Sequence, residues 1–125
     1  MFYERYTDAI FEPKWMRIYM FAGLRGLDIN RRWIDFVENQ VVAKICAEVR
    51  IEMGLPSPDQ CSITPEEIDL YWMFHYGIFY YGVRSHVYGI QPRTELKRFI
   101  ELSIFGLLKG FPSTVSTIPM ARKQP

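Results

Sequence analysis

Hydrophobic positions recur along most of this chain at steps of three and four residues, the spacing typical of amphipathic helices. The clearest run extends from about residue 28 to residue 53, and one stripe on it holds Trp33, Phe36, Val37, Val41, Ile45, Cys46, Val49 and Met53. Charged residues occupy the opposite face, and Gly54 with the following Leu-Pro-Ser-Pro-Asp-Gln predicts a helix end and a loop. We therefore expect one long helix over this segment.

Two shorter helices are predicted before this one. The first covers roughly residues 2–11 and places Tyr3, Tyr6 and Ile10 on one face. Pro13 suits the first turn of the second helix, because proline lacks the amide hydrogen that this turn leaves unbonded. The second helix is expected to end between residues 23 and 26, where glycine can adopt a left-handed cap conformation.

Two longer helices are predicted after the loop. Thr64, Pro65 and Glu67 form a capping-box pattern for the first of them, in which the Glu67 carboxylate reaches back to the Thr64 amide. This helix is expected to run to about residue 88 and to stop at Gly89. The last helix is expected over about residues 94–110.

Together these segments predict an all-α fold, an antiparallel bundle of about five helices. A length of 125 residues suggests a single domain, which we place at residues 1–111, with a flexible tail over residues 112–125. The hydrophobic content of 49% is too high for a disordered chain.

The last two predicted helices are apolar on more than one side. Residues 70–83 carry no charge, and the final helix has Leu102, Phe105 and Leu108 outside its inward stripe. The first three helices can cover only one side, so we expect a homodimer in which the last two helices of each copy form a four-helix interface. Two stripes of small residues would allow close helix approach, unless their glycines serve only as caps: Gly82, Ser85 and Gly89, and Ser103, Gly106 and Gly110.

Charge and targeting signals narrow the expected partners. The net charge of +1 gives no bulk attraction to nucleic acid. The uncharged run over residues 70–83 is too short to cross a bilayer, and the N-terminus lacks a signal-peptide pattern. Two cysteines do not make a disulfide framework. We expect a cytoplasmic protein with no membrane partner.

Two stretches resemble a known bacterial family. Residues 21–33 read Phe-Ala-Gly-Leu-Arg-Gly-Leu-Asp-Ile-Asn-Arg-Arg-Trp, and residues 77–84 read Gly-Ile-Phe-Tyr-Tyr-Gly-Val-Arg, followed by Tyr88-Gly89. Together they resemble the C-terminal regulatory domain of TetR-family transcriptional regulators, over about residues 1–111. The resemblance implies effector sensing, with dimerisation through the last two helices. The family's N-terminal helix-turn-helix domain has no counterpart here, so DNA binding is expected only of a parent protein that carries one.

An aromatic run around His75 is the candidate effector site. Helical spacing brings part of this run together, and neighbouring helices supply further aromatic rings. Apolar walls with a few polar groups favour a small hydrophobic or aromatic effector. The alternative is that His75 is a core or interface histidine among packed rings. The candidate ligand-binding residues are Trp15, Tyr19, Trp33, Tyr71, Trp72, His75 and Phe79.

No motif of enzyme or metal chemistry is recognised. Cys46, Cys61, His75 and His86 are separated by 15, 14 and 11 residues, without the close pairs typical of zinc sites. We therefore expect no metal and no cofactor, and Cys46 is expected in the core. Nucleophile-elbow, phosphate-loop and zinc-protease motifs are absent, so no enzymatic activity is expected. The alternative function is a small helical enzyme or a standalone carrier with an aromatic pocket.

Overall fold

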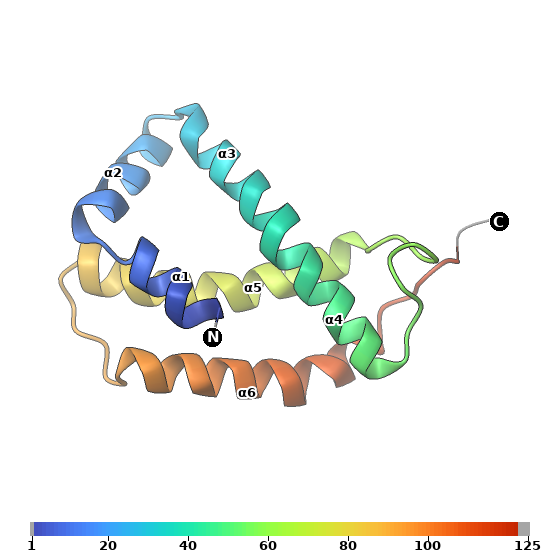
Figure 1. Cartoon of the computed structure of the whole chain (residues 1–125). Helices are drawn as coiled ribbons and strands as arrows, with labels where there is room; N and C mark the ends of the chain where they lie inside the picture. Colours follow the sequence, from blue (N-terminus) through green and yellow to red (C-terminus); the bar gives the residue numbers. More distant parts are fainter. Residues whose placement is uncertain (1, 123–125) are drawn as a thin grey trace.

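The computed structural model describes residues 2–122, and over that range it contains helices and no strand (Figure 1). The expected all-α bundle is confirmed. In chain order the elements are α1 (Phe2–Ile10), α2 (Pro13–Leu24), α3 (Asp28–Val37), the π-helical segment η1 (Glu38–Val42), α4 (Ala43–Met53), α5 (Pro65–Gly82), the π-helical segment η2 (Val83–Val87) and α6 (Leu96–Val115).

Two of the predicted helices contain a π-helical turn. α3, η1 and α4 follow one another without a break, which confirms a helix over residues 28–53. A π turn holds more residues than an α turn, so η1 changes the register of the hydrophobic stripe at its middle. In the same way η2 extends α5 to Val87, and Gly89 follows with a φ of +70°. The expected helix end at Gly89 is confirmed.

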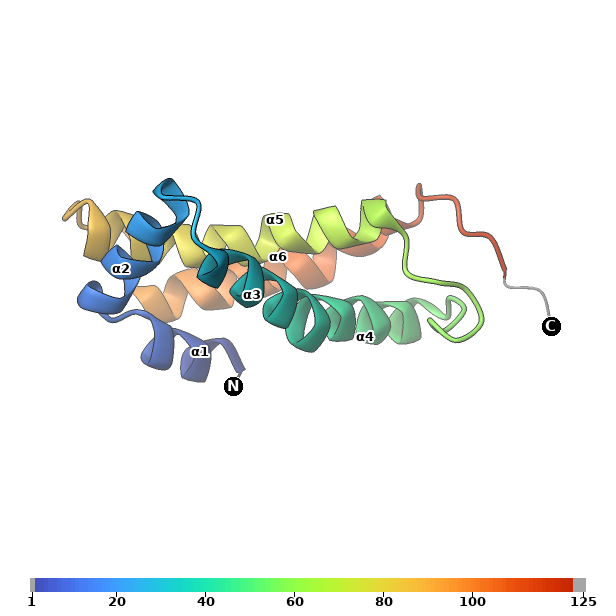
Figure 2. The same cartoon turned by 90° about the horizontal axis from the view of Figure 1, so that it is seen from above.

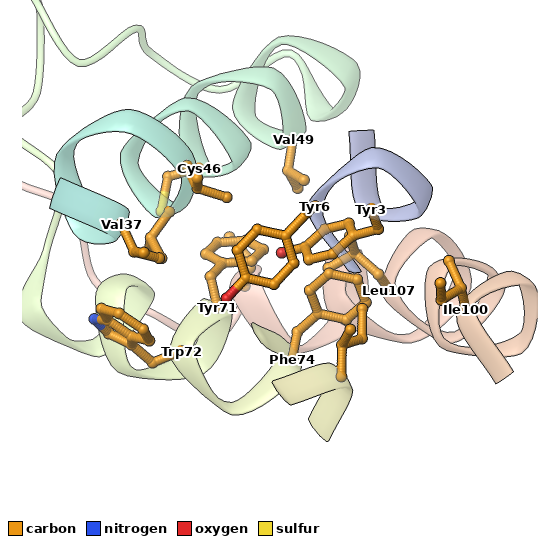
Figure 3. Packing of buried hydrophobic residues seen from close by; sticks show 14 residues of the cluster. Tyr3, Tyr6, Val37, Cys46, Val49, Tyr71, Trp72, Phe74, Ile100 and Leu107 are labelled. Atoms are coloured by element: carbon orange, nitrogen blue, oxygen red, sulfur yellow. The ribbon is translucent and has the colours of Figure 1, made fainter. Parts of the chain in front are cut away.

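α5 and α6 run antiparallel, and α1, η1 and α4 pack against one side of this pair (Figures 1 and 2). α2 contacts η2 and α3 at one end of the bundle. The core lies where these helices meet. Figure 3 shows Val37 and Cys46 facing Tyr71 of α5, with Leu107 on α6 nearby, and all four are buried. The expectation that Cys46 belongs to the core is confirmed.

The loop between α4 and α5 is held by a buried ion pair. The Arg50 guanidinium donates to both carboxylate oxygens of Glu67, over 2.8 and 2.6 Å, and both side chains are fully buried. The same guanidinium donates to the carbonyl oxygens of Pro56, Cys61 and Ser62.

The predicted capping box at the start of α5 is present as well. The Thr64 amide donates to Glu67 and the Glu67 amide donates to Thr64 Oγ1. Burial opposes ionisation of Glu67, but the hydrogen bonds from Arg50 and Thr64 outweigh it and hold its pKa below the usual value.

The last helix is longer at its C-terminal end than the sequence suggested. α6 continues through Pro112 to Val115, whereas a flexible tail was expected from residue 112. Proline in a helix removes one hydrogen bond and crowds the preceding turn. Val115 is buried against the core, and this contact favours continuation of the helix. Residues 123–125 of the expected tail lie outside the described residues.

Of the two predicted stripes of small residues, the one containing Gly82 faces inward. Gly82 is buried, and a Cβ atom placed on it would lie only 2.5 Å from the Phe11 ring. It therefore allows the segment between α1 and α2 to pack on α5 within one chain. Gly89 serves as a left-handed helix cap. Gly82 is therefore covered within the chain, and the alternative that Gly89 is a helix cap is confirmed.

Candidate functional site

His75 lies at the centre of the aromatic run and is bonded on both ring nitrogens. Its side chain is 2% exposed. Nδ1 lies 3.1 Å from the Tyr3 hydroxyl, and Nε2 lies 3.1 Å from the Tyr6 hydroxyl. A neutral imidazole has one donor and one acceptor nitrogen, so one tyrosine accepts a hydrogen bond and the other donates one. The three side chains thereby tie α1 to α5.

This hydrogen-bonded group is electrically neutral near pH 7. Burial lowers the pKa of His75 to about 4, because the imidazolium would lose its hydration. Burial also raises the pKa of both Tyr3 and Tyr6 above the usual value, and the neighbouring phenols raise it further. All three side chains are therefore uncharged, and we call them the neutral centre.

A small cavity of about 40 Å³ lies beside the neutral centre. Five of the seven predicted ligand-binding residues line it: Tyr19, Trp33, Trp72, His75 and Phe79, together with Ile34 and Tyr76. Trp15 stands behind this wall, with its ring 5.2 Å from Tyr19 and 5.6 Å from Trp33. The volume matches roughly one water molecule, at about 30 Å³ each, so a larger ligand requires the rings to move apart.

Tyr71 is the predicted site residue that lies elsewhere. Its ring contacts Phe111 of α6 at 5.5 Å, and its buried hydroxyl has no hydrogen-bond partner. A step of four residues turns an α-helix about 40° beyond a full circle. Tyr71 and Phe79 are thus turned to opposite sides of His75, and only Phe79 faces the cavity. Figure 3 shows Tyr71 among core side chains.

A larger apolar groove, which sequence reasoning missed, opens on the other side of Tyr3. It has a volume of about 380 Å³, within the roughly 300–1,000 Å³ typical of small-molecule sites. Val41 is buried in the core and Ile45 packs against it, as expected of the stripe, and both side chains also form part of the groove wall. No sequence signal marks the π turn η1, to which Val41 belongs. The lining residues are Phe2, Tyr3, Gln40, Val41, Lys44, Ile45, Phe74, Ile104 and Leu107.

The side of α5 and α6 that α1–α4 leave uncovered is apolar. Met73 and Tyr80 on α5 and Leu102 and Phe105 on α6 are all about half exposed or more. Between the two helices runs a furrow of about 400 Å³ whose lining includes the small residues Gly77, Ser103, Gly106 and Gly110. We call these eight residues the outer face. Here the second predicted stripe of small residues is accessible, as expected.

Residues 2–122 contain neither a metal-ligand cluster nor a membrane-spanning helix. No group of three or more His, Cys, Asp or Glu side chains in that range could hold a metal ion. None of its helices combines the length and the apolar character needed to cross a membrane. Cys46 and Cys61 are buried free cysteines, and burial raises the pKa of the Cys46 thiol to about 12. A thiol with so high a pKa is a poor nucleophile at neutral pH.

Comparisons of the chain with protein-family models, with curated proteins and with solved structures find no match. The function is therefore inferred from the geometry of the neutral centre, the groove and the outer face.

Proposed function

We propose that this chain is the effector-binding and dimerisation domain of a TetR-like transcriptional regulator whose helix-turn-helix domain lies outside it. The observation that carries the proposal is the outer face of α5 and α6. Phe105 is 62% exposed and Met73 is 60% exposed. No other helix of residues 2–122 covers the side of α5 and α6 that faces away from α1–α4 (Figure 2). Monomeric proteins seldom leave such a contiguous apolar surface in water.

A second copy of the chain fits this surface. In a two-fold contact the same residues meet from both sides, so an apolar ridge must face an apolar depression. The outer face supplies both, since Met73, which is 60% exposed, lines a furrow that also contains Gly77 and Gly106. Two antiparallel helices from each copy would then form a four-helix interface.

Multi-angle light scattering at micromolar concentration tests this dimer. The wild-type chain should have the mass of two chains, and Phe105→Glu should have the mass of one, because four-helix packing would bury the new carboxylate. Ile51→Glu is the matched control, since Ile51 is an equally exposed apolar residue, 65% accessible, on α4. The control should remain a dimer. A folded wild-type monomer would refute the proposal.

The effector is proposed to bind beside the neutral centre, between α2, α3 and α5. The cavity there has aromatic walls and a few neutral hydrogen-bonding groups, which suits an uncharged aromatic molecule. Entry requires the rings to separate, because the present volume of about 40 Å³ is too small. His75 and the α5 part of the outer face lie on one helix, so ring separation would shift the dimer contact. Effector binding would then change the population of two dimer geometries.

DNA binding is proposed for the parent protein and not for this chain. The +1 net charge gives little electrostatic attraction to a duplex. Reading the coding sequence upstream of Met1 tests this part: a helix-turn-helix encoded in frame supports a regulator. The alternative as an enzyme is weaker, because the low pKa of His75 has a structural cause and both of its nitrogens are bonded to tyrosine hydroxyls. We propose no catalytic role for these residues.

A further inference from the structure

The apolar groove differs from the neutral centre in its shape and in its polar groups. Its walls are aromatic and aliphatic side chains from α1, η1, α4, α5 and α6. Tyr3 belongs to both regions, but its hydroxyl is bonded to His75, so the ring is what it presents to the groove. The apolar walls therefore favour a hydrocarbon body in the groove.

The polar groups of the groove come from one helical turn. Gln40 lies in η1 and Lys44 begins the next turn in α4, and the Lys44 ammonium donates to Gln40 Oε1 over 3.3 Å. No Asp or Glu lines the groove, and within residues 2–122 Lys44 forms no ion pair. The bond leaves the Gln40 amide N–H groups free to donate. The groove thus has one cationic, donor-rich edge.

A π turn at this edge is the second feature that indicates a binding site. Gln40 and Val41 both belong to η1, and both line the groove. π turns are rare and are found frequently at functional sites, because the extra residue redirects nearby side chains. Here the residues of the π turn include Gln40, which accepts a hydrogen bond from Lys44.

We propose that this groove binds a hydrophobic monocarboxylate, with its hydrocarbon chain among the apolar walls and its carboxylate at Lys44 and Gln40. At roughly 30 Å³ for each water-sized group, a volume of about 380 Å³ accommodates about a dozen heavy atoms. Decanoate has this number of heavy atoms. The inference goes beyond the proposed effector site and does not depend on it.

Calorimetric titration of the intact chain with decanoate, decan-1-ol and decylammonium tests the proposal. Decanoate should bind saturably, and octanoate should bind about tenfold more weakly, since two methylene groups fewer are buried. The methyl resonances of Ile45 and Ile104, which line the groove, should shift on binding. Shifts confined to the outer face, or no saturable binding of decanoate, would overturn the proposal.

Reversing the charge at the groove edge gives the sharper result. Lys44 is exposed, so Lys44→Glu should leave the fold intact. The substitution should weaken decanoate binding at least fivefold, strengthen decylammonium binding and leave decan-1-ol binding unchanged. Lys109→Glu is the matched control, an equal charge change at an exposed α6 position outside the groove. Equal effects of the two substitutions, or no effect of Lys44→Glu, would show that the carboxylate does not bind at this edge.

Discussion

α5 carries two buried polar centres that differ in charge, and the difference separates a structural role from a binding role. The charged centre is the Arg50–Glu67 pair at the start of the helix, and the neutral centre is His75 with Tyr3 and Tyr6, about two turns further on. In the charged centre, Arg50 donates two hydrogen bonds to Glu67 and three to carbonyl oxygens of the loop before α5. In the neutral centre, each ring nitrogen of His75 has one partner.

The contrast indicates which centre can exchange its partners. Separating Arg50 from Glu67 would leave an uncompensated charge in the core, which costs several kcal/mol. Separating His75 from a tyrosine leaves a neutral group unpaired, at a cost of about 1–3 kcal/mol. A ligand that supplies one hydrogen bond can offset the smaller cost. The neutral centre, moreover, lies beside a cavity.

The largest expected effect is loss of the charged centre. Arg50→Met should lower the free energy of unfolding by about 3–5 kcal/mol, because the buried Glu67 carboxylate loses its counter-ion. Urea denaturation followed by circular dichroism measures this. The double variant Arg50→Met/Glu67→Leu should regain part of the loss, since it removes both charges. A single-variant loss below about 1 kcal/mol would place the pair among weak ion pairs.

As the pH falls, protonation of His75 in the neutral centre should be the first cause of lost folding stability. His75 binds its proton at about pH 4 in the folded chain and near its usual pKa of 6.5 when unfolded. The unfolded state therefore binds more protons between these values, and stability falls as the pH drops from 6.5 towards 4, by up to about 3 kcal/mol. Glu67, whose pKa is lowered, contributes its own loss only below its usual value of 4.5. Urea denaturation at several pH values should show the fall above pH 4.5 in the wild type and not in His75→Gln.

Removal of one hydroxyl from the neutral centre should have a moderate effect. Tyr3→Phe keeps the ring in place but leaves His75 Nδ1 without its partner. We expect a loss of about 1–2 kcal/mol in the free energy of unfolding. Tyr6→Phe should cost a similar amount through Nε2. An effect near zero for both, measured by thermal denaturation, would mean that these hydrogen bonds do not hold α1 to α5.

The smallest effect is expected at Tyr71, which serves as the internal comparison. Its buried hydroxyl has no partner, so Tyr71→Phe removes a polar group that the fold leaves unsatisfied. We expect no loss of stability and a gain of up to about 1 kcal/mol. A loss as large as that of Tyr3→Phe would reveal a hydrogen bond to water or to a partner at this position.

Much of the fold could be predicted because its signals are local. Hydrophobic residues spaced by three and four marked the helices. The Thr64–Glu67 capping box marked the start of α5, and Gly89 marked the end of its continuation η2. Features that depend on tertiary contact could not be predicted. Arg50 is a buried charged residue whose counter-ion is Glu67, 17 residues later in the chain. This pairing cannot be read from the local sequence.

The candidate site was predicted in part for the same reason. The four-residue spacing along α5 correctly grouped His75 with Phe79. Tyr71 lies four residues before His75 and is rotated to the other side of it, where it contacts Phe111. The partners of His75 come from α1, 72 and 69 residues earlier in the chain. The groove is lined by residues of five separate elements, including two residues of a π turn that leaves no mark in the hydrophobic pattern.

The most direct test of the account is a titration with indole, a neutral aromatic probe with one N–H donor, observed through the ¹⁵N resonances of the His75 ring. We expect saturable binding, a shift of a His75 nitrogen at saturation, weaker binding by His75→Leu and unchanged binding by Tyr71→Phe. Dimer mass should be unchanged in both variants. Unchanged His75 resonances at saturation, or equal indole affinity in wild type and His75→Leu, would contradict the assignment of the neutral centre as the effector site.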